Sequence, residues 1–217
     1  MQDLTIIFLT VNKVPKGWAQ YQKEVLLKAA GGASIITISR EPLDWGTNLI
    51  QTEEPSVINI YRQILRGAKE AKTPFIAIAE DDVLYNKEHY SYRPPMDSFA
   101  YNFSRWGVFT WGEPTYYWRE RISNATLIAP RELAIKSLED RFVRYPNRQI
   151  GELGKEINTR LPRYNVVTYY TTLPVIYFSH INAIDHLEIS RRKRMSLIRA
   201  FDIPYWGRAE DLVKKFA

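Results

Sequence analysis

The first 80 residues alternate short β-branched runs with segments whose apolar residues recur at helical spacing. Residues 4–11, 35–38 and 75–79 read as buried strands, because each run is short, apolar and bounded by turn residues. The intervening segments, 18–29 and 57–68, place their apolar residues on one helical face. Strands that alternate with helices form a largely parallel sheet covered on both faces, so we expect an α/β fold.

Proline and glycine residues set the expected boundaries of these elements. Pro55 suits the first turn of the second helix, because the missing N–H of proline costs nothing there. Residues 39–54 are polar and contain Pro42 and Gly46, so we expect a loop. For the second half we expect strands at 106–111, 125–129, 166–170 and 174–178, and helices at 130–139 and 150–161.

Composition narrows the class of protein. A length of 217 residues fits one domain, and 45% hydrophobic residues suffice for a core. The apolar runs are too short to span a bilayer, and the N-terminus lacks a signal-peptide pattern, so we expect a cytoplasmic location. The absence of cysteine excludes disulfides, thiol nucleophiles and thiolate metal sites. A net charge of +6 favours an anionic partner.

Three consecutive carboxylates follow the strand at 75–79 directly. In parallel sheets, ligands bind beyond the carboxyl ends of the strands, where Glu80, Asp81 and Asp82 are expected to lie. Adjacent carboxylates repel one another, and their burial is costly unless a cation neutralises them. Mg²⁺ and Mn²⁺ bind one or two carboxylates together with phosphate oxygens. The sequence therefore predicts a metal–diphosphate site, with a solvated acidic turn as the alternative.

Other phosphate-binding classes lack their motifs in this chain. An apolar strand that ends in acids also occurs in P-loop ATPases, but those need a Gly-x-x-x-x-Gly-Lys loop, which is absent. A Gly-x-Gly-x-x-Gly dinucleotide loop is absent as well. The metal, aided by basic side chains, is therefore the expected phosphate-binding group.

A resemblance to GT-A glycosyltransferases lies in the run from Ile60 to Tyr85, IYRQILRGAKEAKTPFIAIAEDDVLY. This run is similar to the helix and strand that precede the Asp-x-Asp motif of that family. The resemblance implies a Rossmann-like, mostly parallel sheet flanked by helices. It also implies that Asp82 binds Mn²⁺ or Mg²⁺ and that Glu80 contacts the nucleotide side or the metal. The glutamate at position 80 departs from the aspartate that is common in the family.

The resemblance also implies a division of the chain and a set of donor contacts. The chain would divide into a glycosyltransferase domain at 1–189 and a basic tail at 190–217. The domain would have a donor half at about 1–85 and an acceptor half at about 86–189. A UDP-sugar is the favoured donor. The tail cluster at 191–194 could close over the donor diphosphate, grip nucleic acid or an anionic membrane, or be simply solvated. The donor-site candidates are Thr10, Val11, Asn12, Arg40, Gln63, Arg66, Glu80, Asp81 and Arg192.

The resemblance to the inverting branch of the family implies a carboxylate base at the start of a late helix. Glu152 lies in the first turn of the helix expected at 150–161 and is the candidate base. A carboxylate that stabilises the helix dipole is the alternative role. Asp140 and Glu113 are weaker candidates for the base.

The three histidines have different expected roles. His180 follows the strand at 174–178, and several GT-A families supply a late histidine as a further metal ligand, so His180 is the third metal candidate. A structural role is the alternative for His180. His186 is a weaker ligand candidate, and His89 lies in a polar turn and is expected at the surface.

Aromatic residues cluster between the acidic motif and Glu152, where GT-A enzymes build the acceptor site. Trp106, Trp111 and Trp118 are the acceptor candidates, with Tyr116 and Tyr117 beside them. Flat rings stack on sugars and on bases, and filling the core is the alternative.

The combined features predict a metal-dependent glycosyltransferase that acts by inversion on a hydroxyl acceptor, either a glycan or a modified DNA base. A nucleotidyltransferase is one alternative, although its Gly-rich, Lys-containing loop is poorly matched by residues 12–17. A non-enzymatic basic nucleic-acid-binding module is another, although no recognised motif of that class is present.

Overall fold

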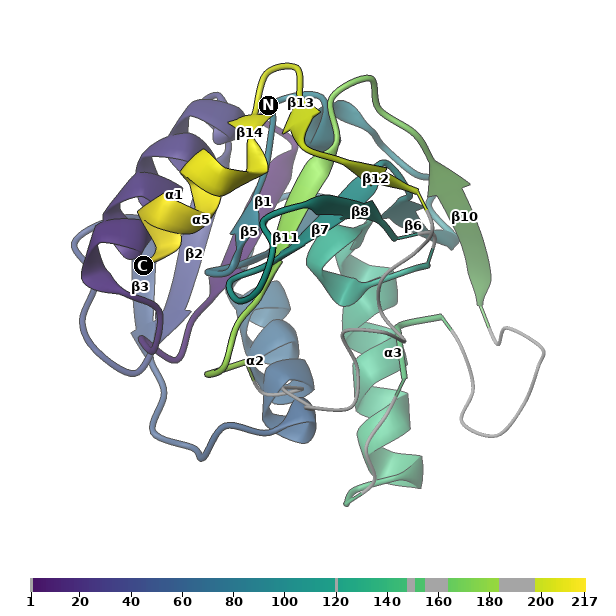
Figure 1. Cartoon of the computed structure of the whole chain (residues 1–217). Coiled ribbons are helices and arrows are strands. Elements are labelled where there is room, and N and C mark those ends of the chain that lie inside the picture. The colour runs from purple at the N-terminus through teal and green to yellow at the C-terminus, as the bar shows by residue number, and fades with distance from the viewer. Residues whose placement is uncertain (1, 120, 148–150, 155–163, 184–197) are drawn as a thin grey trace.

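A seven-stranded sheet forms the centre of the protein. This computed structural model describes residues 2–119, 121–147, 151–154, 164–183 and 198–217 (Figure 1). Every neighbouring pair of strands in the sheet is parallel except at β9, which runs antiparallel to both β4 and β6. The predicted α/β fold with a largely parallel sheet is confirmed. The strands, in spatial order, are β10 (Asn165–Tyr169), β6 (Ser98–Asn102), β9 (Leu127–Pro130), β4 (Phe75–Glu80), β1 (Leu4–Leu9), β2 (Ser34–Ser39) and β3 (Thr47–Ile50).

Helices cover both faces of this sheet (Figure 1). On one face, α2 (Val57–Glu70) and α3 (Arg131–Arg144) pack side by side and bury alternate strand residues such as Ile7 and Ile78. On the other face, α1 (Lys16–Ala30) buries residues of the opposite alternation, such as Ile6. Because side chains alternate between the faces of a strand, strands that are apolar throughout serve both layers.

A second, five-stranded sheet stands against the end of β4. Its order is β12 (Arg199–Ala200), β8 (Tyr116–Trp118), β7 (Arg105–Phe109), β11 (Val175–Ser179) and β5 (Val83–Leu84). Since β5 follows the three acidic residues at once and pairs antiparallel with β11, the acidic turn connects the two sheets. The strands predicted near 106–111 and 174–178 are confirmed as β7 and β11, whereas β5, β8 and β12 were not predicted.

The described part of the predicted tail belongs to the folded core. Strand β12 pairs with β8, and β13 (Asp202–Ile203) pairs with β14 (Gly207–Arg208). Helix α5 (Ala209–Phe216) then buries Phe216 against Trp18 and Phe178, at ring-centroid distances of 4.8 and 5.3 Å. Residues 198–217 are therefore no appendage, because their apolar side chains complete a core cluster with α1 and the second sheet.

Two predicted boundaries were wrong for identifiable reasons. The expected loop at 39–54 contains β3, whose Asn48 donates from Nδ2 to Oγ1 of Thr37 and to Oγ of Ser39, at 2.8 and 2.9 Å. Pro55 lies outside α2, because the hydroxyl of Ser56 accepts a hydrogen bond from the backbone N–H of Asn59 and caps the helix there.

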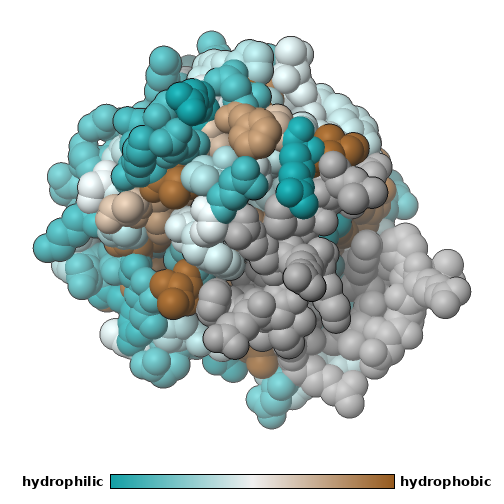
Figure 2. All heavy atoms as spheres, viewed as in Figure 1, coloured by the Kyte–Doolittle hydropathy of each residue, from teal (hydrophilic) through white to brown (hydrophobic). Residues whose placement is uncertain are grey.

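The surface agrees with this burial of apolar faces. Figure 2 shows mostly hydrophilic side chains over the α1 and α5 side of the molecule, with apolar atoms in small separate patches. None of the helices in the described ranges has both the length and the apolar character needed to cross a membrane.

The prediction of a surface position for His89 was wrong. The residue begins a short 3-10 helix, η1 (His89–Ser91), and its side chain is fully buried. Its Nδ1 lies 3.0 Å from the Tyr169 hydroxyl and 3.3 Å from Nδ2 of Asn102. Burial lowers the pKa of His89 to about 3, so the folded protein holds this imidazole neutral.

We expect His89 to make the protein less stable as the pH falls. Below the ordinary histidine pKa of about 6.5, His89 of the unfolded chain is protonated. In the folded protein His89 stays neutral down to about pH 3. The free energy of unfolding should therefore fall by about 1.4 kcal/mol per pH unit across this window, in addition to other effects. Urea denaturation from pH 7 to pH 4 should show a shallower dependence for His89→Gln. Equal slopes for the two proteins would contradict the neutral, buried histidine.

Candidate active site

A cavity of about 360 Å³ opens where β1 and β4 end, a volume within the range of small-molecule sites. One wall comes from the end of β1 and from α2, including Thr10, Val11 and Gln63. The acidic turn after β4 lies between this wall and a second one formed by β7, β8 and β11. The cavity therefore lies at the strand ends where the sequence predicted a ligand.

The backbone of the acidic turn is fixed by hydrogen bonds from distant elements. The indole N–H of Trp18 donates to the carbonyl of Asp81 at 2.7 Å, and the backbone N–H of Phe178 donates to the carbonyl of Asp82 at 2.9 Å. The amide of Gln22 donates to the carbonyl oxygens of Glu80 and Val83, both at 3.3 Å. These bonds hold the turn in one conformation and direct its carboxylates.

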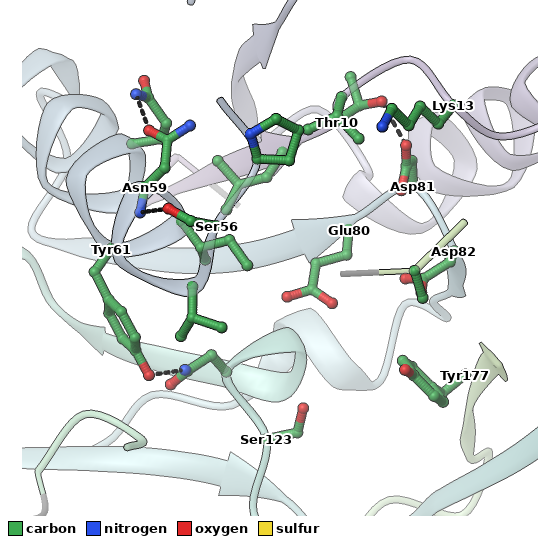
Figure 3. A pocket seen from close by; sticks show the side chains of 18 of the residues that line it. Thr10, Lys13, Ser56, Asn59, Tyr61, Glu80, Asp81, Asp82, Ser123 and Tyr177 are labelled. Atoms are coloured by element: carbon green, nitrogen blue, oxygen red, sulfur yellow. Dashed lines mark hydrogen bonds between the residues drawn. The ribbon is translucent and has the colours of Figure 1, made fainter. Parts of the chain in front are cut away.

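The three carboxylates point in different directions (Figure 3). Asp81 accepts a hydrogen bond from the hydroxyl of Thr10 at 2.5 Å, whereas Glu80 extends into the cavity. Asp82 is buried, and its Oδ2 lies 3.6 Å from Nε2 of His180. Burial and the adjacent charge of Asp82 raise the pKa of Asp81 well above its ordinary value. The turn thus concentrates negative charge at a place where its burial is costly.

The side chains at this turn fit a hard divalent cation of the kind that also binds phosphate. Glu80, Asp82 and His180 line the same cavity and offer two carboxylates and one imidazole. Within the described ranges, no group of three histidine or acidic side chains is close enough to hold a metal ion alone. Mg²⁺ and Mn²⁺ are commonly bound by one or two carboxylates, with phosphate oxygens completing the shell. This donor set fits such an ion, with Asp82 as the first candidate ligand.

The structure brings only some of the predicted donor contacts to the cavity. Besides the acidic residues, Thr10, Val11 and Gln63 line it. Asn12 does not, because its Oδ1 accepts the backbone N–H groups of Arg40 and Glu41, at 2.9 and 3.0 Å, and joins the ends of β1 and β2.

The remaining basic donor candidates have other contacts. The guanidinium of Arg40 forms an ion pair with Glu54 at 3.2 Å, and that of Arg66 donates to the carbonyl of Ile50 at 2.7 Å. Neither lines the cavity. Arg192, with the rest of the cluster at 191–194, and His186 lie outside the described residues.

Glu152 lines the cavity, but not at the start of a helix. Residues 151–154 form a turn in which Gly154 has φ = +90°, and most of the predicted helix at 150–161 lies outside the described residues. The other two base candidates do not line the cavity: Asp140 pairs with Arg144 on α3, and Glu113 lies exposed in a loop.

Buried polar side chains anchor the turn that carries Glu152. Arg141 donates to the carbonyls of Gly151 and Glu152, at 3.0 and 2.8 Å. The hydroxyl of Tyr61 also donates to Gly151 at 2.7 Å, and Asn124 donates to that hydroxyl. Burial raises the pKa of Tyr61 above its ordinary range, so the phenol remains a donor. Glu152 is thereby held at the cavity although it lies outside regular structure.

The predicted aromatic acceptor residues do not line this cavity. Trp106 and Trp118 face each other across β7 and β8, with ring centroids 5.6 Å apart, and Trp111 packs on Phe109 at 5.0 Å. Tyr116 and Tyr117, their neighbours in sequence, are fully buried. The acceptor role of the three tryptophans therefore stays a prediction without a geometric link to the cavity.

Several cavity residues were not anticipated from the sequence. Arg105, Arg119 and Tyr177 line the second wall, and Asn59 and Asn124 are also among the polar lining residues. The sequence did contain a pattern that could have indicated the two arginines as site residues. Arg105 and Arg119 are charged residues at the ends of strands that are rich in aromatic residues. Only the pairing of β7 with β8, which no local pattern indicates, brings the two together.

The fold has a counterpart among solved structures. A glycosyltransferase involved in the glycosylation of the major capsid of PBCV-1 superposes with a TM-score of 0.50 at 14% sequence identity, over 80% of this chain and 92% of that one. The chain has a GT-A-like fold. The sequence itself matches no protein-family model and no curated protein.

Two further structures resemble this GT-A-like chain more weakly. The bifunctional IspDF from Campylobacter jejuni has a TM-score of 0.42 at 8% identity, over 78% of this chain and 50% of that one. Residues 1–349 of S. aureus TarS, in complex with UDP-GlcNAc, have a TM-score of 0.41 at 12% identity, over 82% and 59%. At these identities the likeness concerns the fold alone.

Proposed function

We propose that this protein transfers a sugar from a nucleotide-diphosphate sugar, with UDP-sugars favoured, to a hydroxyl acceptor with the aid of Mn²⁺ or Mg²⁺. The observation that carries the proposal is that Glu80, Asp82 and His180 all line one cavity at the ends of β1 and β4 of a GT-A-like fold. Ligands of open α/β sheets bind at this place. The burial of adjacent carboxylates there also favours a function that brings in a cation.

The residues on the different walls of the cavity would have different roles in binding. Thr10, Val11 and Gln63, at the β1 and α2 wall, would contact the nucleotide. Asp82, with Glu80 and His180 beside it, would hold the cation. When bound, the cation would offset the negative charge that builds up on the departing diphosphate.

Glu152 would act as the general base of a single, inverting displacement. The acceptor oxygen forms a bond to the anomeric carbon as the bond from that carbon to the diphosphate oxygen breaks. The acceptor proton passes to the Glu152 carboxylate, a contribution typically worth about 10²–10⁴-fold in rate. Anchoring by Arg141 and Tyr61 supports this role, because a base must be held within hydrogen-bonding distance of its proton.

Nucleotide binding is the first test of the proposal. Thermal unfolding of the protein should be followed with Mn²⁺ and a panel of nucleoside diphosphates, beginning with UDP. A diphosphate present at about 100 times its Kd should stabilise the protein by about 2.7 kcal/mol, which raises the Tm of a domain of this size by about 5–10 °C. The matching nucleoside-diphosphate sugar should also be hydrolysed slowly when no acceptor is present.

The controls separate a metal–diphosphate site from general charge effects. The nucleoside without phosphates, and the diphosphate with EDTA in place of Mn²⁺, should give much smaller shifts. The proposal is wrong if no nucleotide changes the Tm with or without metal. If transfer is observed, the anomeric configuration of the product, measured by NMR, tests inversion separately.

A further inference from the structure

Two buried arginines lie side by side on the second wall of the cavity. Arg105 begins β7 and Arg119 follows β8, and the backbone N–H of Arg119 donates to the carbonyl of Arg105 at 3.1 Å. Both side chains line the cavity, although their residues are only 3% and 6% exposed. Arg121, which is exposed, adds a third positive charge to the lining.

Within the described ranges, these guanidinium groups lack the carboxylate partners that buried arginines ordinarily have. Among the described residues, neither Arg105 nor Arg119 forms an ion pair with a carboxylate. Nε of Arg105 is buried without a hydrogen-bond partner in the described part of the chain, and Arg119 reaches the Tyr117 hydroxyl only at 3.5 Å. Burial and the charge of Arg119 lower the pKa of Arg105 to about 10, so it remains positive at neutral pH. A buried charge without a partner is costly, and a bound anion would remove that cost.

Tyr177 orients both groups. The guanidinium carbon of Arg105 lies 5.8 Å from the centroid of this ring, and that of Arg119 lies 5.4 Å from it. Stacking against an aromatic face fixes the plane of a guanidinium and leaves its N–H edges able to bind phosphate or carboxylate oxygens. The two arginines are thus held in place before any ligand arrives.

The position of this arginine pair separates it from the nucleotide wall. Figure 3 shows Tyr177 beside Asp82, and Asn59 of α2 beyond Glu80 on the other side of the acidic turn. The proposed nucleotide contacts at Thr10 and Gln63 belong to the β1 and α2 wall, whereas Arg105 begins β7 and Arg119 directly follows β8. An anion bound by the arginines would therefore lie on the far side of the carboxylates from the nucleotide.

We propose that Arg105 and Arg119 form a binding site for an anionic group, a phosphate or a carboxylate, carried by the acceptor. This inference rests on the proposed sugar transfer, because it makes the acceptor an anionic molecule. The arginines would also offset the repulsion that Glu80, Asp82 and Glu152 exert on such an acceptor.

Anion titrations of matched variants test the proposal. Inorganic phosphate and acetate serve as probes for the two chemistries, each titrated by calorimetry with and without saturating UDP and Mn²⁺. The wild-type protein should bind at least one anion saturably, and should still do so when UDP is bound. Arg105→Met and Arg119→Gln should each weaken that binding at least about tenfold, because each removes charge-assisted hydrogen bonds. Arg62→Gln, at an exposed arginine paired with Glu53, is the matched control and should leave anion binding unchanged.

Stability and charge retention provide further readouts. Arg105→Met should not lower the Tm of the ligand-free protein, because it removes a buried charge that lacks a carboxylate partner in the described ranges. Arg105→Lys keeps the charge but loses the planar donors, so it should still bind phosphate, but more weakly. If the methionine variant does not fold, the anion titrations are made with this lysine variant instead.

Two results would overturn the proposal. The first is a wild-type protein that binds neither anion. The second is an equal loss of UDP and anion affinity in the arginine variants, which would assign the arginines to the donor diphosphate. If the wild-type protein does not bind UDP at all, the proposed function fails, and anion titration without nucleotide still decides whether the arginines form an anion site.

Discussion

Replacing Asp82 with asparagine is expected to abolish most metal-dependent turnover of the nucleotide-sugar. The substitution keeps the size of the side chain but removes the charge that is proposed to bind the cation at the acidic turn. We expect the rate of donor hydrolysis in Mn²⁺ to fall at least about 100-fold, equivalent to about 2.7 kcal/mol of transition-state stabilisation. The UDP-induced rise in Tm should become independent of Mn²⁺. Hydrolysis assays and thermal unfolding with and without metal measure both effects.

The stability of the same variant separates loss of function from loss of fold. The charges of Asp81 and Asp82 repel each other, which destabilises the folded protein when no metal is bound. Asp82→Asn removes this repulsion and should therefore keep or raise the Tm without ligands. Asp44→Asn is the matched control, because Asp44 is an exposed carboxylate paired with Lys23. Metal-dependent turnover that survives in Asp82→Asn would assign the acidic turn a purely structural role.

Glu152→Gln is expected to slow sugar transfer to the acceptor by about 10²–10⁴-fold, the usual contribution of a general base. The amide has nearly the same shape as the carboxylate but does not accept the acceptor proton. Since the hydrogen bonds that anchor this turn go to the backbone carbonyls at 151 and 152, the turn should keep its position in the variant. The kcat for transfer should therefore fall, while the Kd for UDP and Mn²⁺ changes little.

The control for this variant is Glu132→Gln, which removes an exposed carboxylate near the start of α3. It should transfer sugar at the wild-type rate. Transfer by Glu152→Gln within a few-fold of wild type would place the base elsewhere in the chain.

Local patterns were sufficient to predict three strands and two helices in the first half of the fold, namely β1, β2, β4, α1 and α2. The residues of β1, β2 and β4 are apolar on both faces, and those of α1 and α2 repeat at helical spacing, so each element is determined by its own sequence. Ser56 and Gly31, which fix helix ends, follow ordinary capping chemistry. The position of the cavity at the end of β4 followed from the same reasoning.

The second sheet was less predictable because its strands depend on partners that are distant in sequence. Strand β5 has two residues and β8 has three, too few for a periodic signal, and they form because β11 and β7 pair with them. The same pairings create the arginine wall of the cavity. His89 was misplaced for a related reason, since a polar turn in sequence became buried once Tyr169 and Asn102 had packed around it.

The packing of α5 has a consequence for the order in which the active centre can be assembled during synthesis. Phe216 supports Trp18, and the indole of Trp18 holds the carbonyl of Asp81. A nascent chain that still has residues 209–216 inside the ribosome would thus have every proposed ligand and the proposed base translated, yet lack the packing of Phe216 on Trp18. The proposed metal-binding geometry should therefore gain its full support only after α5 has emerged and docked.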